Sequence, residues 1–271
     1  MTVLFVADIC GKVGRQAASF IIKSLKEEHN IDYVIANIEN AAGGFGVTPE
    51  MSRKAFGYGI NVQTSGNHIW DRYEIIQYIQ KEPRLLRPNN YPSGVPGNGT
   101  YLDIVGDKKV ATINVMGRAF LKDIDCPFES AFKAVERLRS ETKIIIVDMH
   151  AEATAEKQAM LYYLDGKISA LIGTHTHVQT ADETITEKGT AFISDVGMTG
   201  PHDSVIGMEK DPSLARFLTG MPKRMSTASG DIKLSGVLLK IDDSSGICES
   251  IERLKIDFDP GNLPVSNNHE E

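Results

Sequence analysis

The stretch Ile168-Ser169-Ala170-Leu171-Ile172-Gly173-Thr174-His175-Thr176-His177 places a short apolar run directly before a pair of histidines. The apolar run has the length of a buried strand, and Gly173 suggests that the strand ends there and the backbone turns. Two imidazoles on one tight loop at a strand end can converge on a metal ion, because imidazole nitrogen binds zinc, manganese and iron. The alternative is two surface histidines without a metal. The residues at the other strand ends are needed to distinguish the two interpretations.

Three more apolar runs of strand length end in polar side chains that bind metals. Residues 3–7 lead to Asp8, residues 33–38 lead to Glu39 and Asn40, and residues 60–64 lead to Asn67 and His68. In open α/β sheets, ligands bind at the carboxyl ends of strands. Capping of the following helix is the alternative role for Asp8, and ordinary turn chemistry is the alternative for the Asn67–His68 pair.

A fifth apolar run, residues 143–149, ends in His150, for which a buried structural role is the alternative. Apolar periodicity predicts the remaining elements: helices over residues 15–29, 128–140 and 151–164, a hairpin of residues 101–105 with 109–115, and a terminal β-pair of residues 233–241 with 248–256. This alternation of strands and helices predicts an α/β fold. We find no repeat or linker, so we expect one domain over residues 1–258 and a polar tail over residues 259–271.

Composition excludes several classes of protein. The 271 residues are 41% hydrophobic and 24% charged, which is typical of a globular protein, and the net charge of −7 argues against a broad nucleic-acid or membrane surface. Three cysteines fit no disulfide or zinc framework. The N-terminal residues lack the pattern of a signal peptide, and no apolar run approaches the ~20 residues of a membrane helix. We therefore expect a cytoplasmic protein with reduced thiols.

Together the five strand ends offer two carboxylates, two amides and four imidazoles. A single tetrahedral zinc takes four ligands, so this set is too large for one zinc site. It suits two ions of octahedral type that share a bridging carboxylate and keep room for water. Paired ions roughly 3.5–4 Å apart clamp the attacking and leaving oxygens in phosphoryl transfer.

The order and spacing of these groups resemble the calcineurin-like metallophosphoesterases, and most closely their YmdB-like branch of bacterial phosphodiesterases. Four motifs carry the resemblance: Ala36-Asn37-Ile38-Glu39-Asn40-Ala41, Thr64-Ser65-Gly66-Asn67-His68-Ile69-Trp70, Gly173-Thr174-His175-Thr176-His177-Val178-Gln179-Thr180-Ala181-Asp182, and Asp195-Val196-Gly197-Met198-Thr199-Gly200. The chain departs from the broad superfamily at Cys10, where that pattern has histidine, and at Glu39-Asn40, where it has Gly-Asp. Both departures agree with the YmdB-like branch, so Cys10 is not expected to be a ligand.

The resemblance implies two metal ions joined through Glu39. It assigns one metal to Asp8, Glu39, Asn40 and His177, and the other to Glu39, Asn67, His150 and His175. It leaves His68 without a metal and makes it the group that protonates the leaving alkoxide, while a hydroxide bridging the metals attacks phosphorus in line. The donor set of oxygen and nitrogen without thiolate favours iron or manganese, with zinc as the alternative.

The resemblance also implies a four-layer α/β/β/α sandwich, hydrolysis of phosphodiesters with 2′,3′-cyclic nucleotides as the expected substrates, and a homo-oligomer, either a dimer or a tetramer. Two other functions fit the same metal site. One is a phosphomonoesterase or protein phosphatase, and the other is a nucleotide-sensing regulator in which the metal site only binds.

Overall fold

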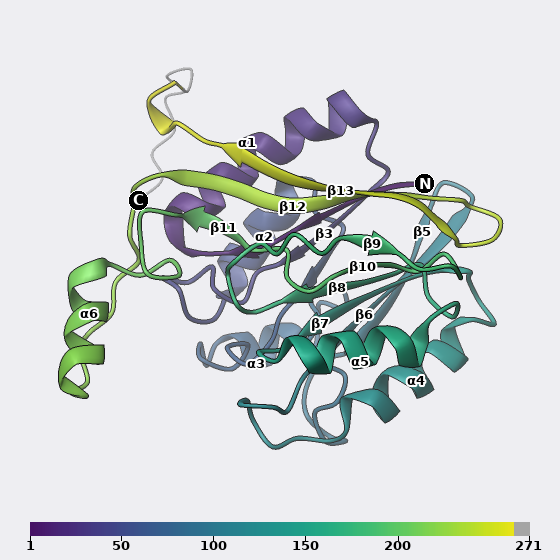
Figure 1. The fold of residues 1–271 in the computed structure, drawn as a ribbon, viewed down its shortest axis with the longest axis horizontal. Coiled ribbons are helices and arrows are strands. Elements are labelled where there is room, and N and C mark those ends of the chain that lie inside the picture. The colour runs from purple at the N-terminus through teal and green to yellow at the C-terminus, as the bar shows by residue number, and fades with distance from the viewer. Residues whose placement is uncertain (263–271) are drawn as a thin grey trace.

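The computed structural model describes residues 1–262 and contains two β-sheets. The first sheet has seven strands, and β12 lies beside β1, β11 and β13. Its members are β2 (Asp8–Ile9), β11 (Met198–Pro201), β12 (Ile232–Ile241), β1 (Thr2–Val6), β3 (Tyr33–Asn37), β4 (Val62–Thr64) and β13 (Cys248–Asp257). Strands β1, β3 and β4 run parallel, so their carboxyl ends lie at one edge (Figure 1).

The second sheet has six strands and a parallel centre of β6, β7, β8 and β10. Its order is β5 (Thr100–Val105), β6 (Lys108–Met116), β7 (Ile144–His150), β8 (Ala170–Thr174), β10 (Ala191–Ile193) and β9 (Thr184–Ile185). The central strand β7 is buried along its whole length, as expected for a parallel strand covered on both faces.

Alternating side chains of the strands divide the apolar core into three layers. In β1, Val3 and Phe5 face the second sheet, whereas Leu4 and Val6 face helices. In β7, Ile144 and Ile146 face the first sheet, and their neighbours in sequence face helices on the other side. Because successive strand residues point to opposite faces, two sheets that are buried on both faces require helices outside them.

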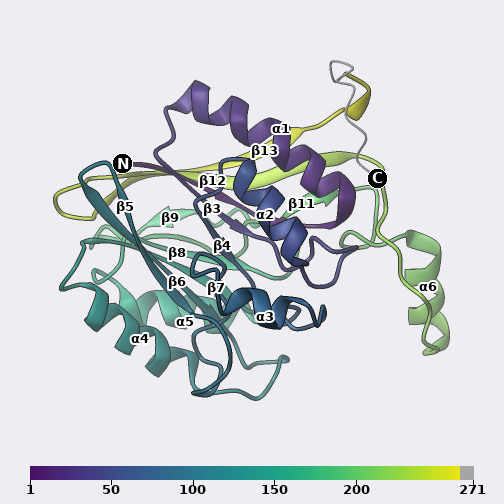
Figure 2. The same ribbon diagram turned by 180° about the vertical axis from the view of Figure 1, so that it is seen from behind.

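Helices cover both outer faces, which confirms the predicted four-layer sandwich. Figure 2 shows the first group in front of the first sheet, namely α1 (Gly11–His29), α2 (Pro49–Gly57) and the short α3 (Ile75–Ile79). On the second sheet lie α4 (Pro127–Leu138) and α5 (Thr154–Leu164). The last helix, α6 (Lys210–Thr219), stands away from the layers in both views.

The long predicted elements are confirmed, including the β5–β6 hairpin and the β12–β13 pair. Several predicted boundaries were wrong by two to four residues; α5, for example, begins at Thr154 and not at residue 151. The first helix begins at Gly11, and strand β8 continues through Gly173 to Thr174. A Cβ on Gly173 would lie 1.8 Å from the carbonyl oxygen of Ser194, so this glycine permits close strand packing and does not end the strand.

Elements of two to five residues, namely β2, β9, β11 and α3, were not predicted, because they are too short to show a period. The helix α6 was also not predicted. Of the predicted polar tail, residues 259–262 are described and include a 3-10 turn at Pro260–Asn262, whereas residues 263–271 lie outside the described part of the chain. Among residues 1–262, no helix is both long and apolar enough to cross a membrane.

Helix α1 lies so close to β11 that only glycine fits at position 14. A Cβ on Gly14 would lie 2.3 Å from the backbone carbonyl oxygen of Thr199, whereas a Cβ on Gly57 in α2 would meet nothing within 4 Å. We expect Gly14→Ala to lower the free energy of unfolding by about 1–3 kcal/mol. The control Gly57→Ala is expected to raise it by about 0.4–1 kcal/mol. Urea unfolding measures both, and equal stability of Gly14→Ala and wild type would contradict this packing.

Candidate metal centre

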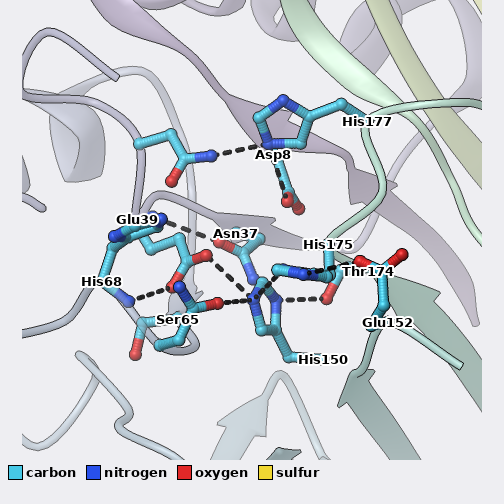
Figure 3. Close-up of polar contacts among 12 residues, drawn as sticks. Asp8, Asn37, Glu39, Ser65, His68, His150, Glu152, Thr174, His175 and His177 are labelled. Carbon is cyan, nitrogen blue, oxygen red and sulfur yellow. Dashed lines mark hydrogen bonds and ion pairs between the residues drawn. The ribbon is translucent and has the colours of Figure 1, made fainter. Parts of the chain in front are cut away.

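The side chains singled out in the sequence gather at the carboxyl-end edge shared by the two sheets (Figure 3). The first sheet contributes the residues that follow β1, β3 and β4. The second sheet contributes those at the ends of β7 and β8. They are Asp8, Glu39, Asn40, Asn67, His68, His150, His175 and His177. Asp8, Glu39, Asn40 and His150 are almost completely buried, so their polar atoms depend on neighbouring side chains for partners, whereas the other four are partly exposed.

One group of ligand atoms centres on His150. Its Nε2 lies 2.9 Å from Oε1 of Glu39, 3.0 Å from Nδ1 of His175 and 3.0 Å from Oδ1 of Asn67. One ligand atom each of Glu39, His150 and His175 falls within 4.8 Å of the others, a spacing that fits a single metal ion. All four predicted members of this metal site are therefore together.

A second group lies around His177. Its Nε2 is 3.4 Å from Oδ2 of Asp8 and 2.6 Å from Nδ2 of Asn40. Within residues 1–262, both carboxylate oxygens of Asp8 and Oδ1 of Asn40 are buried without a hydrogen-bond partner. Buried oxygens without partners are costly, and a cation that prefers oxygen and imidazole ligands would satisfy them. The donor chemistry of this group therefore fits a metal ion.

The outer nitrogen of each histidine is bound to a different acceptor. Nδ1 of His150 contacts Oγ1 of Thr174 at 2.9 Å, and this hydroxyl donates to Oδ1 of Asp148 at 2.7 Å. Nε2 of His175 lies 3.0 Å from Oε2 of Glu152. These bonds leave Nε2 of His150 and Nδ1 of His175 facing the site. Acceptors of this kind orient metal-binding imidazoles and make them more basic.

His177 is held by the segment that precedes α6. Its Nδ1 donates to the carbonyl oxygen of Ile206 at 2.9 Å, so Nε2 faces Asp8 and Asn40. Ile206 has a φ of 47°, which is rare for a β-branched residue. Strained backbone of this kind tends to occur at functional sites, and here it points a carbonyl group at an imidazole of the site.

In the absence of metal, the titratable groups around His150 have widely different pKa values. Burial opposes the charge of Glu39, but adjacent His150 outweighs burial and lowers the carboxyl pKa to about 2. Burial likewise opposes a charged His150, but Glu39 raises its pKa to about 9. Burial and the positive charge of His150 together lower the pKa of His175 to about 3. A proton on His150 therefore occupies the place that a cation would take.

His68 lies beside this group without joining it. Its backbone N–H donates to Oε2 of Glu39 at 3.0 Å, and its Nδ1 lies 2.7 Å from Oδ2 of Asp71. The ring of Phe45 packs edge-on against the imidazole, with centroids 5.1 Å apart. These contacts hold the ring and leave Nε2 as the nitrogen available to a ligand, which is the geometry of an oriented general acid or base.

Sequence reasoning missed the residues that support the site. Asp71 lies three positions after His68, but the pattern gave it no role. Asn37 connects the sheets, since its Oδ1 accepts from the backbone N–H of Glu39 at 3.1 Å and its Nδ2 donates to Oδ2 of Asp148 at 3.3 Å. Asn37 lies within the motif Ala36–Ala41, and membership of this motif was the only sign in the sequence that Asn37 supports the site.

A buried ion pair holds the loop that carries the histidine pair. Nζ of Lys157 in α5 lies 2.9 Å from Oδ2 of Asp195, and the same oxygen accepts the backbone N–H of Thr176 at 2.9 Å. Both side chains are almost completely buried. The sequence did not predict this ion pair, because a lysine in a helix gives no sign of burial.

Two further residues show how tightly the site is packed. A Cβ on Gly66 would lie 2.0 Å from Cδ2 of His150, so the Gly-Asn-His turn requires glycine at this position. Cys10 is buried, and burial raises the pKa of its thiol to about 12, with the charge of Asp8 adding to the effect. The thiol therefore stays protonated near neutral pH, whereas metal binding requires a thiolate.

The sandwich and the ligand group at its strand ends define a protein of the metallophosphoesterase type. The same fold occurs in the sulfate thiohydrolase SoxB of Thermus thermophilus, with a TM-score of 0.55 and 13% identity over 94% of this chain and 44% of that one. A model of the YmdB-like protein family matches residues 4–254. The chain therefore belongs to the YmdB-like family.

Two relatives agree with this assignment over nearly their whole length. The chain is 44% identical over 260 residues to the 2′,3′-cyclic-nucleotide 2′-phosphodiesterase of Bacillus subtilis strain 168, covering 96% of this chain and 98% of that protein. The crystal structure of a phosphatase from Mycoplasma pneumoniae superposes with a TM-score of 0.89. Identity to it is 30%, over 96% of this chain and 95% of that one.

The Asp148–Thr174–His150 chain of hydrogen bonds makes a direct prediction about metal affinity. We expect Thr174→Val to weaken metal binding by about 10–100-fold, because His150 loses the acceptor that orients it. The measurement is calorimetric titration of chelator-treated protein with Mn²⁺. The control is Thr112→Val, a buried threonine of β6 paired with Ile146, four residues along β7 from His150. Unchanged affinity in Thr174→Val would contradict this role.

Proposed function

We propose that this protein is a metal-dependent phosphodiesterase that hydrolyses 2′,3′-cyclic nucleotides at a dinuclear centre. The observation that carries the proposal is the pair of adjoining ligand groups. One is built on His150, and the other holds buried oxygens of Asp8 and Asn40 that have no hydrogen-bond partner among the described residues. The activity of the Bacillus subtilis relative, similar over nearly the whole chain, supports the choice of substrate.

The proposal divides the predicted ligands into two sets that share Glu39. Asp8, Glu39, Asn40 and His177 hold one metal, and Glu39, Asn67, His150 and His175 hold the other. The position of Glu39 supports a shared role, because it is buried and follows β3 of the first sheet, yet it contacts His150 of the second. Mixed oxygen and nitrogen donors without thiolate favour iron or manganese, with zinc as the alternative.

Two bound cations would lower the pKa of a water molecule and neutralise charge on the phosphate. In the chain itself, His68 acts as the proton donor to the leaving oxygen. Its Nδ1 is bound by Asp71, which orients the ring so that Nε2 carries the transferable proton. Because Glu39 binds the backbone N–H of His68, the proton donor and the shared metal ligand keep a fixed separation.

The family resemblance also supports a homo-oligomer, and we include a dimer or tetramer in the proposal. A cytoplasmic location is consistent with three free cysteines, two of them buried. The net charge of −7 supports a small-molecule substrate over a nucleic-acid surface.

The test of the proposed function combines metal content with substrate preference. Protein purified without chelator is expected to hold about two metal ions per chain by elemental analysis. It is expected to hydrolyse 2′,3′-cyclic AMP and bis(p-nitrophenyl) phosphate, and to act more slowly on the monoester p-nitrophenyl phosphate. Chelation is expected to abolish the activity, and Mn²⁺ or Fe²⁺ to restore it.

Fewer than two metals per chain, with no diester hydrolysis after Mn²⁺ or Fe²⁺ is added, would refute the dinuclear phosphodiesterase. Faster hydrolysis of the monoester would indicate a phosphomonoesterase that uses the same metals.

A substitution at His68 separates catalysis from binding. We expect His68→Asn to lower kcat for 2′,3′-cyclic AMP by about 10²–10⁴-fold, because the leaving oxygen loses its proton donor. Metal content is expected to stay unchanged, since His68 belongs to neither ligand set. His29→Asn, at the last residue of α1, serves as the matched control and is expected to keep full activity. If His68→Asn retained its kcat, the proton-donor role would be wrong.

A further inference from the structure

The loop that connects β6 to α4, residues 117–126, borders the candidate metal centre. At its start, the backbone N–H of Gly117 donates to the carbonyl oxygen of His150 at 2.9 Å. In its middle, Nζ of Lys122 donates to the carbonyl oxygen of Asn67 at 3.0 Å. Both acceptors belong to residues that we propose as metal ligands. The loop is therefore in contact with the site at two points.

Between these two contacts the loop exposes an aromatic ring. Phe120 is 90% exposed, more than any other large apolar side chain among residues 1–262. It lies three positions after Gly117 and two positions before Lys122. Because consecutive Cα atoms are 3.8 Å apart, the Cα atom of Phe120 lies within about 8 Å of that of Lys122. The ring is therefore at the rim of the site.

The backbone holds Phe120 in a conformation that favours glycine. The N–H of Leu121 donates to the carbonyl oxygen of Arg118 at 3.2 Å and closes a turn in which Phe120 is the third residue. Phe120 has a φ of 62°, and glycine or asparagine usually occupies a turn position with positive φ. Strained residues of this kind persist only where the surrounding structure fixes them, and they cluster at sites that hold ligands.

Contacts on both sides of the turn fix it in place. Oε1 and Oε2 of Glu156 in α5 accept the backbone N–H groups of Arg118 and Ala119, at 3.0 and 3.3 Å. At the other end, Nδ2 of the buried Asn90 donates to the carbonyl oxygen of Asp125 at 3.0 Å, and its own carbonyl oxygen accepts the backbone N–H of Asp125 at 3.1 Å. The aromatic ring is thus held at the rim before any ligand binds, which lowers the entropic cost of binding.

Two side chains of this loop match the two ends of a nucleotide. Every nucleobase has a flat face that stacks on an aromatic ring, which suits Phe120. The ammonium of Lys122 has three N–H donors, of which Asn67 uses one. Among residues 1–262 this ammonium has no carboxylate partner. In a chain of net charge −7, a cation at the rim favours an anionic substrate.

We propose that the loop of residues 117–126 binds the nucleotide substrate, with the ring of Phe120 stacked on the base and Nζ of Lys122 at the phosphate. The ribose separates the base from the phosphate, so two side chains are needed to contact both. Stacking accepts every base, so the loop selects nucleotides over smaller diesters without selecting one base. This inference deepens the proposed function and rests on it.

The experiment compares 2′,3′-cyclic AMP with methyl riboside 2′,3′-cyclic phosphate, which has no base. In Mn²⁺-loaded protein, Phe120→Ala is expected to raise KM for 2′,3′-cyclic AMP by about 5–100-fold and to leave kcat unchanged, because only stacking is lost. KM for the base-free substrate is expected to stay at the wild-type value. Phe120→Trp keeps a flat ring and is expected to retain the wild-type KM. The matched control, Tyr162→Ala, removes an aromatic side chain that is 76% exposed on α5 and is expected to change neither KM.

Calorimetric titration makes the test independent of turnover. Mn²⁺-loaded Phe120→Ala is expected to bind adenosine 3′-monophosphate about 5–100-fold more weakly than wild type. Its binding of inorganic phosphate is expected to be unchanged, because phosphate has no base to stack.

A second variant tests the phosphate contact. Lys122→Gln is expected to weaken binding of both adenosine 3′-monophosphate and inorganic phosphate by about 2–5-fold at low salt, and by less as salt is raised, because the ammonium is exposed. The matched control, Lys133→Gln, removes an exposed lysine of α4 and is expected to bind both ligands like wild type.

Several outcomes would overturn the inference. Unchanged binding of adenosine 3′-monophosphate by Phe120→Ala would refute stacking, and unchanged phosphate binding by Lys122→Gln would refute the phosphate contact. An equal rise of KM for the base-free substrate would show that Phe120 shapes the metal site and does not contact the base. A changed sedimentation coefficient of Phe120→Ala, with nucleotide binding intact, would identify a protein contact as the role of the exposed ring.

Failure of the proposed function has a different signature. Wild type would then hydrolyse neither cyclic phosphate, whereas the calorimetric titrations would still decide whether the loop binds a nucleotide.

Discussion

The contact between Glu39 and His150 is the constraint on which the rest of the site depends. Glu39 follows β3 in the first sheet and His150 ends β7 in the second, and their side chains meet at 2.9 Å in a buried position. Two buried polar groups from different sheets can meet only if the sheets pack in one register. The apolar layer between the sheets supplies this register, and the hydrogen bond from Asn37 to Asp148 reinforces it.

Close packing of backbone and side chains around this contact leaves little freedom to the candidate ligand side chains. Gly66 lets the Asn67–His68 turn lie against the ring of His150, and Gly173 lets β8 lie against the segment at Ser194. The loop that carries His175 and His177 is held by the Lys157–Asp195 pair, because Asp195 also accepts the backbone N–H of Thr176. Ligands held in this way need little rearrangement when charge develops during a reaction, which is a major source of catalytic power.

The candidate metal centre is physically connected to the segment that precedes α6. His177 lies beside Asp8, and its outer nitrogen donates to the carbonyl oxygen of Ile206 in that segment. A displacement of this segment therefore also changes the orientation of one imidazole of the site. The connection is a single hydrogen bond, not a long path through the core.

The sequence by itself determined the strands, the side chains at their ends and the types of donor, because burial periodicity and residue chemistry are local properties. It also predicted that Asp8, Glu39, His150 and His177 meet, through the order of their motifs. Only the tertiary structure decided which nitrogen of each histidine faces the site, and that Asp71, Asp148, Thr174 and Glu152 support them. It also decided that apolar side chains of α6, such as Phe217 and Leu218, are exposed. These features arise from contacts between residues far apart in the chain, and such contacts depend on how the two sheets pack.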